Sequence, residues 1–310
     1  MNITGNAFIN GVHRRWRYRD LYLLMIIPVI YVCIFHYGPM YGVLMAFKRF
    51  APRLGVWNSP WVGLWNFQRL FRSPIFYEII RNTLNLSLYN LVAGFPFAII
   101  LALCVNHCIF PKFKKITQSL TFAPHFLSAV LMVGLIAQML ATRTGAFNVF
   151  LNNMGIPEIN FLGSAPAFPH VYVWSNVWQH TGFAAIIYIS SLAGVDPTYH
   201  EAALIDGANL WQRVWHIDLA TIRPIIIIML ILNMGRVLTV GFEFVYLMQN
   251  SLNISRSEIV STYVYKVGIQ SSQPDYSFGT AIGLFQNVIG LSLTLIVNKI
   301  ADKVSGEGMF

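Results

Sequence analysis

The sequence predicts an all-α fold, a polytopic membrane bundle of six transmembrane helices, from three observations. Of the 310 residues, 56% are hydrophobic and only 11% are charged, whereas a soluble domain carries about 25% charged residues. Six stretches each hold about 20 mostly apolar residues, the length that a helix needs to cross the hydrocarbon core. Their apolar runs are continuous instead of alternating, which favours helices over a barrel. The composition therefore excludes a soluble enzyme, a disordered chain and a disulfide scaffold.

The spans follow a basic N-terminal segment, residues 1–20, which is expected in the cytoplasm. The first apolar stretch is too long for the core of a cleaved signal peptide. The apolar run Ile225–Ile228 and the predominantly apolar run Leu291–Val297 mark the fifth and sixth spans. The predicted spans cover about residues 21–47, 80–105, 119–141, 170–193, 224–247 and 276–298, inside a transmembrane domain of residues 21–303 that is followed by a cytoplasmic tail of residues 304–310.

The positive charges set the expected orientation. Eleven of the 21 Lys and Arg residues fall on the side of the N-terminus, eight on the other side, and two within or beside spans. The positive-inside rule then puts both termini in the cytoplasm. The cluster from Arg14 to Arg19 lies where a membrane anchor is expected, so the net charge of +9 does not predict nucleic-acid binding.

The fifth predicted span carries Asn233, Arg236 and Glu243 at spacings of three and seven residues. On one continuous helix these side chains form a single stripe, with Val240 between them. A charge near the bilayer centre costs at least about 2.5 kcal/mol, so the stripe is expected to face the bundle interior or a watery cavity. It predicts either a role in the passage of a solute or an Arg/Glu pair that fixes helix packing.

Other spans carry similar polar residues. Amides beside aromatic rings suit a sugar, because amides hydrogen-bond hydroxyls and rings cover the apolar faces of the sugar. The alternative is hydrogen bonding between helices, which explains most single amides in membranes. Besides the stripe of the fifth span, the candidates for a solute pathway are Arg81, Asn85 and Tyr89 in the second span, Asn176 and Gln179 in the fourth, and Gln286 and Asn287 in the sixth.

No motif predicts catalysis, a metal site or a bound cofactor. His180 has no His or Cys partner at ligand spacing. The sequence holds no HExxH, paired-Cys, GxSxG or Gly-rich phosphate-loop motif. We therefore expect a chain that is not an enzyme and has no catalytic residue. If it moves a solute uphill, another polypeptide must handle the ATP.

The predicted cytoplasmic loop, about residues 194–223, indicates a helical hairpin. Asp196 and Pro197 form a helix start, since the aspartate caps the helix and the proline has a helical φ. The first helix is expected over Thr198 to Asp206, and Gly207 is expected to end it. A second short helix is expected from about Asn209 to His216.

The first helix of this hairpin suits docking to a partner. Its small residues, Ala202 and Ala203, allow close approach to a groove, and Glu201 and Asp206 offer charged contacts. The alternative is a helix that lies on the membrane surface.

A motif in this loop resembles a known family. Glu201-Ala202-Ala203, three residues, Gly207, nine residues, Ile217, one residue and Leu219 are similar to the EAA loop of binding-protein-dependent ABC importer permeases. The family pattern ends in Leu-Pro, whereas this chain has Ala220, which bears on the bend after the second helix. Further segments resemble permeases for complex-polysaccharide fragments, relatives of the maltose-type subunits: Asn82-Thr83-Leu84, Pro124-His125-Phe126-Leu127-Ser128, Asp206-Gly207-Ala208-Asn209 and Thr262-Tyr263-Val264-Tyr265.

The resemblance implies a type I importer in a bacterial cell membrane. It implies a second permease subunit, two ATPase subunits that use ATP and Mg²⁺, an extracellular or periplasmic solute-binding protein, contact with membrane lipid, and an oligosaccharide as solute. It also implies that the EAA loop forms a coupling helix in a groove of the ATPase, with Glu201, Ala202, Ala203 and Gly207 at its core and Asp206 beside them.

Two questions stay open at this stage. The chain could instead be a secondary transporter driven by an ion gradient, with His180, Arg236 and Glu243 as a relay, although only six spans and no internal repeat are apparent. The solute is also unnamed, since uronic-acid oligomers would use Arg81 and Arg236 whereas neutral oligosaccharides would need only amides and aromatic rings.

Overall fold

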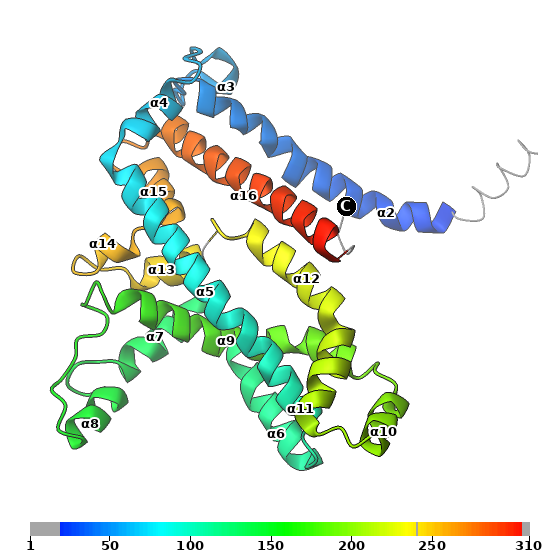
Figure 1. Cartoon of the computed structure of the whole chain (residues 1–310). Coiled ribbons are helices and arrows are strands. Elements are labelled where there is room, and N and C mark those ends of the chain that lie inside the picture. Colours follow the sequence, from blue (N-terminus) through cyan, green and yellow to red (C-terminus); the bar gives the residue numbers. More distant parts are fainter. Residues whose placement is uncertain (1–18, 240, 306–310) are drawn as a thin grey trace, which may run out of the picture.

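The computed structural model describes residues 19–239 and 241–305, and within these residues every named element is a helix or a helical turn. The model confirms the predicted all-α fold (Figure 1). The basic cluster up to Arg17, Val240 and the tail from residue 306 lie outside the described residues.

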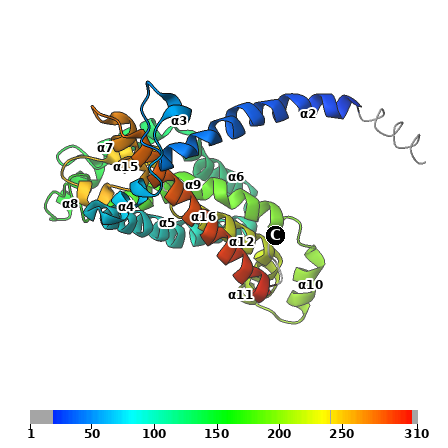
Figure 2. The ribbon, with the colours of Figure 1, turned by 90° about the horizontal axis from the view of Figure 1, so that it is seen from above.

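The first predicted span is continuous. It consists of α2 (Arg19–Val32), a π-helical turn η1 (Cys33–Tyr37) and a 3-10 helix η2 (Gly38–Phe47). The second half, η2, packs along α16 (Tyr276–Ser305), whereas α2 projects away from the rest of the molecule (Figure 2). The apolar side chains of α2 are therefore exposed along its length.

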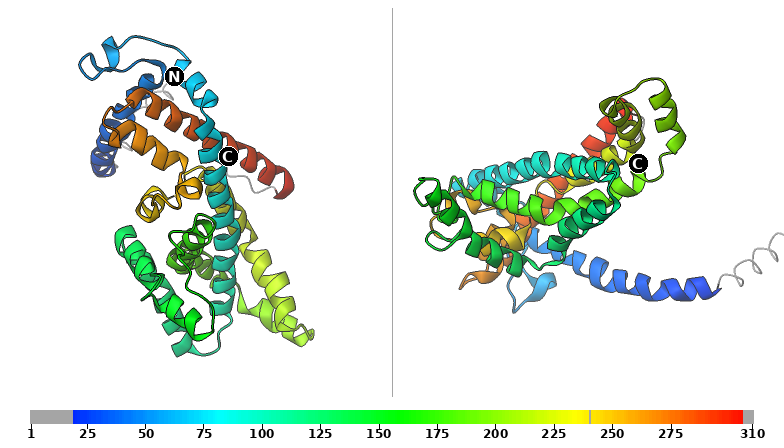
Figure 3. Two further views of the ribbon diagram at one scale, coloured as in Figure 1. Left: turned by 90° about the vertical axis from the view of Figure 1, so that its left-hand side faces the viewer. Right: turned by 90° about the horizontal axis from the view of Figure 1, so that it is seen from below.

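The two long helices α5 (Pro74–Asn106) and α9 (Phe168–Leu192) form the centre of the fold. Each has a proline in its first turn, where the missing N–H costs no hydrogen bond. They lie side by side, and α5 runs through the middle of the molecule (Figure 3). A cluster of small and aromatic side chains joins them to the start of α12, and its buried members are Ala98, Ala102, Ala185, Tyr188, Leu192 and Ile222.

The third predicted span, 119–141, is not one straight helix. Helix α6 (Pro111–Phe122) continues into a short 3-10 turn, η3 (Ala123–Phe126), and α7 (Ala129–Met139) then leaves at an angle of 107°. Ser128 starts α7 as its N-cap, since its hydroxyl accepts a hydrogen bond from Leu131 N. The apolar pattern predicted the segment but not the bend.

The prediction of one helix over residues 224–247 is wrong. Helix α11 (Leu210–Arg213), the π-helical turn η4 (Val214–Asp218) and α12 (Leu219–Gly235) run on as one continuous helix, which includes Ala220. The chain leaves the helix after Gly235, and α13 (Phe242–Met248) begins separately.

Among the described residues, four helices are long and apolar enough to cross a membrane: Leu21–Phe47, Pro74–Asn106, Leu210–Gly235 and Tyr276–Lys303. The bent pair of α6 with η3 and α7 would be a fifth. Helix α9, which matches the fourth predicted span, has 25 residues but carries polar side chains on several turns. The lengths of these helices are consistent with six spans, and the number of spans stays a prediction.

The remaining elements are short and connect the long helices. They are α3 (Gly55–Asn58), α4 (Trp65–Arg72), α8 (Ala146–Asn153), α10 (Pro197–Ile205), α14 (Ile254–Ser257), α15 (Val260–Tyr265) and η5 (Lys266–Gln270). Helix α10 stands clear of the long helices at one end of the molecule (Figure 1).

Candidate functional site

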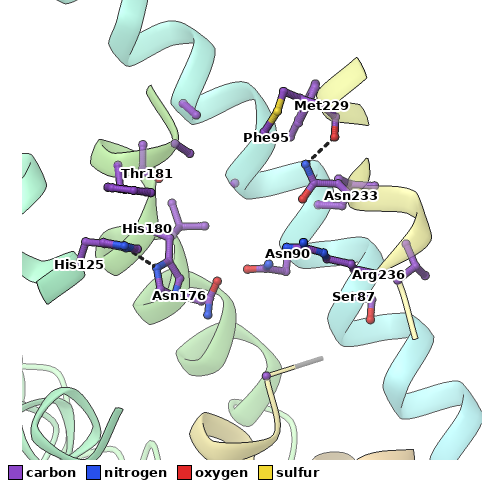
Figure 4. A pocket seen from close by; sticks show the side chains of 18 of the residues that line it. Ser87, Asn90, Phe95, His125, Asn176, His180, Thr181, Met229, Asn233 and Arg236 are labelled. Carbon is purple, nitrogen blue, oxygen red and sulfur yellow. Dashed lines mark hydrogen bonds between the residues drawn. The ribbon is translucent and has the colours of Figure 1, made fainter. Parts of the chain in front are cut away.

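A cavity of about 490 Å³ lies between α5, η3, α9, α12 and the segment of residues 236–241. Figure 4 shows polar side chains that reach it from both sides, with His125, Asn176 and His180 opposite Asn90 and Asn233. The polar lining residues with hydrogen-bonding or charged side chains are Ser87, Asn90, His125, Tyr172, Asn176, His180, Thr181, Tyr188, Asn233, Arg236 and Thr239.

Three polar atoms in this lining have no hydrogen-bond partner within the described part of the chain. They are Ser87 Oγ, Asn90 Oδ1 and Thr181 Oγ1, and all three are buried. Most buried polar atoms in native proteins are hydrogen-bonded, so each exception needs an explanation. Because these atoms line one cavity, together they suit a solute with many hydroxyl groups.

Two histidines meet in the cavity wall. His125 Nδ1, from η3, lies 3.1 Å from His180 Nδ1 of α9, so one ring donates a hydrogen bond to the other. The ring of His125 also stacks on Phe183 at 3.9 Å. Sequence reasoning gave His180 no partner because the two residues are 55 positions apart and no local spacing links them.

The cavity has a positive electrostatic character. Arg236 supplies a permanent positive charge, and the histidine pair adds ring N–H donors. No Asp or Glu is among the described residues that line it. Glu243, at the start of α13, is exposed and outside the lining, so the predicted stripe of Asn233, Arg236 and Glu243 on one helix is wrong. The helix break after Gly235 is the physical reason.

Three predicted pathway residues, Asn176, Asn233 and Arg236, do line the cavity. The predicted face of α5 does not. Arg81, Asn85 and Tyr89 lie on the side of the helix roughly opposite Ser87 and Asn90 at 3.6 residues per turn, so their inward placement was wrong. The Tyr89 hydroxyl instead bonds to His170 Nδ1 at 3.0 Å and accepts from Trp174 Nε1 at 3.0 Å, while Arg81 and Asn85 are exposed.

The two predicted glutamines bond to backbone carbonyls at the helix breaks. Gln179 Nε2 donates to Leu127 O, at the bend between η3 and α7, over 3.0 Å. Gln286 Nε2 donates to Leu238 O, in the segment between α12 and α13. Irregular backbone at membrane depth needs such partners, because no water is there to satisfy it. Neither lines the cavity, and Asn287 lines a separate cavity of about 380 Å³ beside η2 and η5.

The loop with the predicted docking helix has the expected geometry. Asp196 Oδ1 accepts a hydrogen bond from Thr198 N at 2.9 Å, and this bond holds the pKa of Asp196 below its usual value. Gly207 ends the turn after α10 with a φ of +80°, a conformation that favours glycine. The side chains of Glu201, Ala202 and Asp206 are exposed and Ala203 is half-buried, and a shallow cavity of about 220 Å³ separates Ala203 from η4.

A buried carboxylate joins this loop to the long helices. Asp218, at the end of η4, is fully buried, and its Oδ2 lies 2.7 Å from His107 Nε2. Its Oδ1 lies 3.4 Å from His200 Nε2 of α10. Sequence reasoning did not find this group, since its members lie in three different elements. The described residues hold no cluster of three His, Cys, Asp or Glu side chains arranged to bind a metal ion.

Comparisons with known proteins agree on one type of protein. No family model matches the chain. Protein LplB of Bacillus subtilis (strain 168) is 42% identical over 99% of this chain and 96% of its own length. The polygalacturonan/rhamnogalacturonan transport system permease protein YteP of the same organism is 40% identical over 94% of this chain and 90% of its own length.

Solved structures give the same result. A chain of a bacterial ABC transporter involved in the import of the acidic polysaccharide alginate is 33% identical, with a TM-score of 0.87 over 96% of this chain and 99% of that chain. A chain of the same kind of transporter, in complex with a periplasmic protein that holds an alginate pentasaccharide, gives a TM-score of 0.88 at 33% identity over 97% of this chain and 99% of that chain.

Proposed function

Since this chain belongs to the permease subunits of ABC importers of sugars and oligosaccharides, we propose that its solute is an acidic oligosaccharide that contains uronic acids. It is a multi-pass membrane transport subunit and not an enzyme, and a separate subunit hydrolyses the ATP. The relatives give no support to the alternative of a gradient-driven transporter.

The observation that carries this proposal is the charge of the cavity. Arg236 and the pair of His125 and His180 lie in its lining, and no described carboxylate there opposes them. A charged donor forms a stronger hydrogen bond to a carboxylate than to a neutral hydroxyl. The unpaired atoms Ser87 Oγ and Asn90 Oδ1 suit the hydroxyls of the same sugar.

The names of the relatives support the same class of solute. YteP is named for polygalacturonan and rhamnogalacturonan, and the solved relative imports alginate, described as an acidic polysaccharide. We infer an oligosaccharide fragment for this chain as well, delivered by a solute-binding protein like the periplasmic protein in the complex of the solved relative.

The remaining partners follow from the architecture of such importers. We infer that a second permease subunit covers part of the exposed apolar surface of α2, and that lipid covers the rest. Two ATPase subunits would dock on α10, where Glu201, Ala202 and Asp206 are exposed, with Ala203 and Gly207 beside them. That docking would place both termini on the cytoplasmic side of a bacterial cell membrane. The ATP and Mg²⁺ would be bound by the partner ATPase subunits.

Uptake into ATP-loaded proteoliposomes tests the proposal. The complete importer, with its solute-binding protein, is given labelled trigalacturonate or the neutral maltotriose. Trigalacturonate uptake is expected to dominate, and Arg236→Gln is expected to lower it about tenfold or more, since it removes a charged hydrogen bond. Arg236→Lys, which keeps the charge, retains part of the uptake, and Arg256→Gln, at an exposed site outside the cavity, is the matched control. Preferred uptake of maltotriose, or trigalacturonate uptake unchanged in Arg236→Gln, would refute an acidic solute.

A further inference from the structure

Helix α10 has little attachment to the rest of the molecule. Turns connect it at both ends, with Gly194 and Val195 before it and Gly207 after it. It stands clear of the long helices (Figure 1, Figure 2). Within residues 19–239 and 241–305, one side-chain polar contact joins α10 to the continuous helix of α11, η4 and α12. It is the contact of His200 with Asp218, at the end of η4. A force applied to α10 can therefore reach the long helices through this contact as well as through the turns.

The contact ends on a carboxylate that is held on both sides. Asp218 is fully buried; its Oδ2 is hydrogen-bonded to His107 Nε2 at 2.7 Å, and its Oδ1 lies 3.4 Å from His200 Nε2, an ion-pair distance without hydrogen-bond geometry. The rings of His107 and His200 also meet edge to face, with centroids 5.9 Å apart. A buried carboxylate is costly without partners, so Asp218 favours an arrangement in which both imidazoles stay close to it. We call Asp218, His107 and His200 the His-Asp-His link.

The two long-helix members of the link lead directly to the cavity. His107 caps the C-terminus of α5, the helix that supplies Ser87 and Asn90 to the cavity lining. Asp218 immediately precedes α12, and from there to Asn233 the helix spans fifteen residues, about 22 Å.

The packing above the link is close enough to carry a displacement. Ile222, one turn beyond Asp218, is fully buried against α5 and α9. Well-packed interiors have low compressibility and transmit strain. The π-helical turn η4, which ends at Asp218, is of a kind that occurs often at functional sites.

We propose that Asp218, His200 and His107 are positioning residues that transmit the displacement of α10 to α12 and α5, and so couple ATP hydrolysis to the opening of the cavity. This inference rests on the proposed docking of the ATPase on α10. It adds residues that the EAA pattern does not specify: one on the far end of α5, one on α10 itself and one at the entrance to α12.

Variants of His200 test the link with least damage to the fold, because the 2.7 Å contact of Asp218 with His107 remains. His200→Leu removes the imidazole that faces Asp218, and His200→Gln keeps an N–H group near the position of Nε2. The matched control is His216→Leu, on the same loop, whose exposed ring hydrogen-bonds to the local Gln212 O. Each complete importer is measured for copurified ATPase subunits, basal ATP hydrolysis, stimulation by the trigalacturonate-loaded binding protein, and uptake per ATP hydrolysed.

His200→Leu is expected to retain the ATPase subunits and basal hydrolysis but to lose about fivefold or more in uptake per ATP, the usual lower range of coupling between sites. His200→Gln is expected to restore most of that ratio, and His216→Leu to leave it unchanged. A merely structural role would lower assembly and all rates together without changing uptake per ATP.

Two other results would overturn the inference in different ways. If His200→Leu keeps the wild-type ratio while the ATPase subunits copurify, the link does not transmit the displacement, although docking on α10 stands. If a Glu201→Lys importer shows wild-type copurification and stimulation, docking on α10 itself is wrong, and the inference falls with the proposed function.

Discussion

Gly182 sets how closely α6 and α9 approach, and a single methyl group there should change the cavity. A Cβ built on Gly182 would overlap the backbone carbonyl oxygen of Thr121 and would lie 3.0 Å from Phe122 N. These two residues end α6, directly before the turn that carries His125, and His180 lies two positions before Gly182. The close approach at this glycine therefore fixes the distance between the two histidines.

The size of the effect follows from the same distances. Ordinary van der Waals contact begins at 3.4 Å, so Gly182→Ala must move Phe122 N by about 0.4 Å and the carbonyl of Thr121 by more. A shift of that size takes the 3.1 Å contact of His125 and His180 to about 3.5 Å, where a hydrogen bond is lost. Since backbone atoms oppose the methyl group, the cost is about 2 to 3 kcal/mol, at the upper part of the range for overpacking.

The assay compares Gly182→Ala with Gly134→Ala in the purified importer. Gly134 lies on α7, and a Cβ there would meet no atom within 4 Å, so alanine should be neutral or stabilise the helix by up to about 1 kcal/mol. We expect Gly182→Ala to lower the thermal midpoint by several degrees and to reduce trigalacturonate uptake, and Gly134→Ala to do neither. Equal midpoints for the two variants would refute the argument from close packing.

Three further predictions concern the loops. Gly207→Ala should lower the ATPase stimulation by the loaded binding protein, since alanine costs about 1 kcal/mol at the positive φ after α10, and basal hydrolysis is the internal control. Asp196→Ala should speed hydrogen exchange at Thr198 N, whereas Asp196→Asn, which keeps a capping oxygen, should not. Because the pKa of Asp196 is lowered in the folded state, capping by its carboxylate is complete above the unfolded pKa of 3.8 and is lost only as the pH falls through the folded pKa. The protection of Thr198 N should therefore not change between about pH 5 and 8. Lys266→Met should destabilise the importer by about 2 kcal/mol, because it leaves the mostly buried Glu258 carboxylate without its 2.7 Å partner. The double variant that also carries Glu258→Gln should recover most of this lost stability, and additive losses in the double variant would contradict the pairing.

Local pattern predicted most of the fold. The apolar stretches located the long helices, and the start at Asp196 with the turn at Gly207 predicted α10 to within one residue at each end. The breaks in the third and fifth spans were not predicted, because each span was defined by its average hydrophobicity, which stays high although Pro124 and Ser128 stand at the first break and Gly235 and Gly241 flank the second. Hydrophobicity reports the depth of a residue in the membrane and not the direction in which the chain runs.

The candidate site was predictable only in part, because its contacts join distant positions. A spacing of three or four residues describes one face of a helix but does not say which face meets the cavity, and for α5 the wrong face was chosen. His125 and His180, like His107 and Asp218, are brought together by packing between helices. No pattern in one sequence contains that information.

The helix breaks explain which amides remain for the solute. Each break leaves a backbone carbonyl that needs a donor in the membrane interior, and one glutamine serves each, Gln179 at the bend of the third span and Gln286 at the break of the fifth. Asn233 donates to Met229 O on its own helix at 2.7 Å, which leaves its Oδ1 as an acceptor. With these groups assigned, the cavity retains the side chains of Asn90, Asn176 and Arg236 and the Oδ1 atom of Asn233 for a solute, and only Arg236 among them carries a permanent charge. Discrimination between acidic and neutral oligosaccharides in this chain should therefore depend on that arginine more than on any amide.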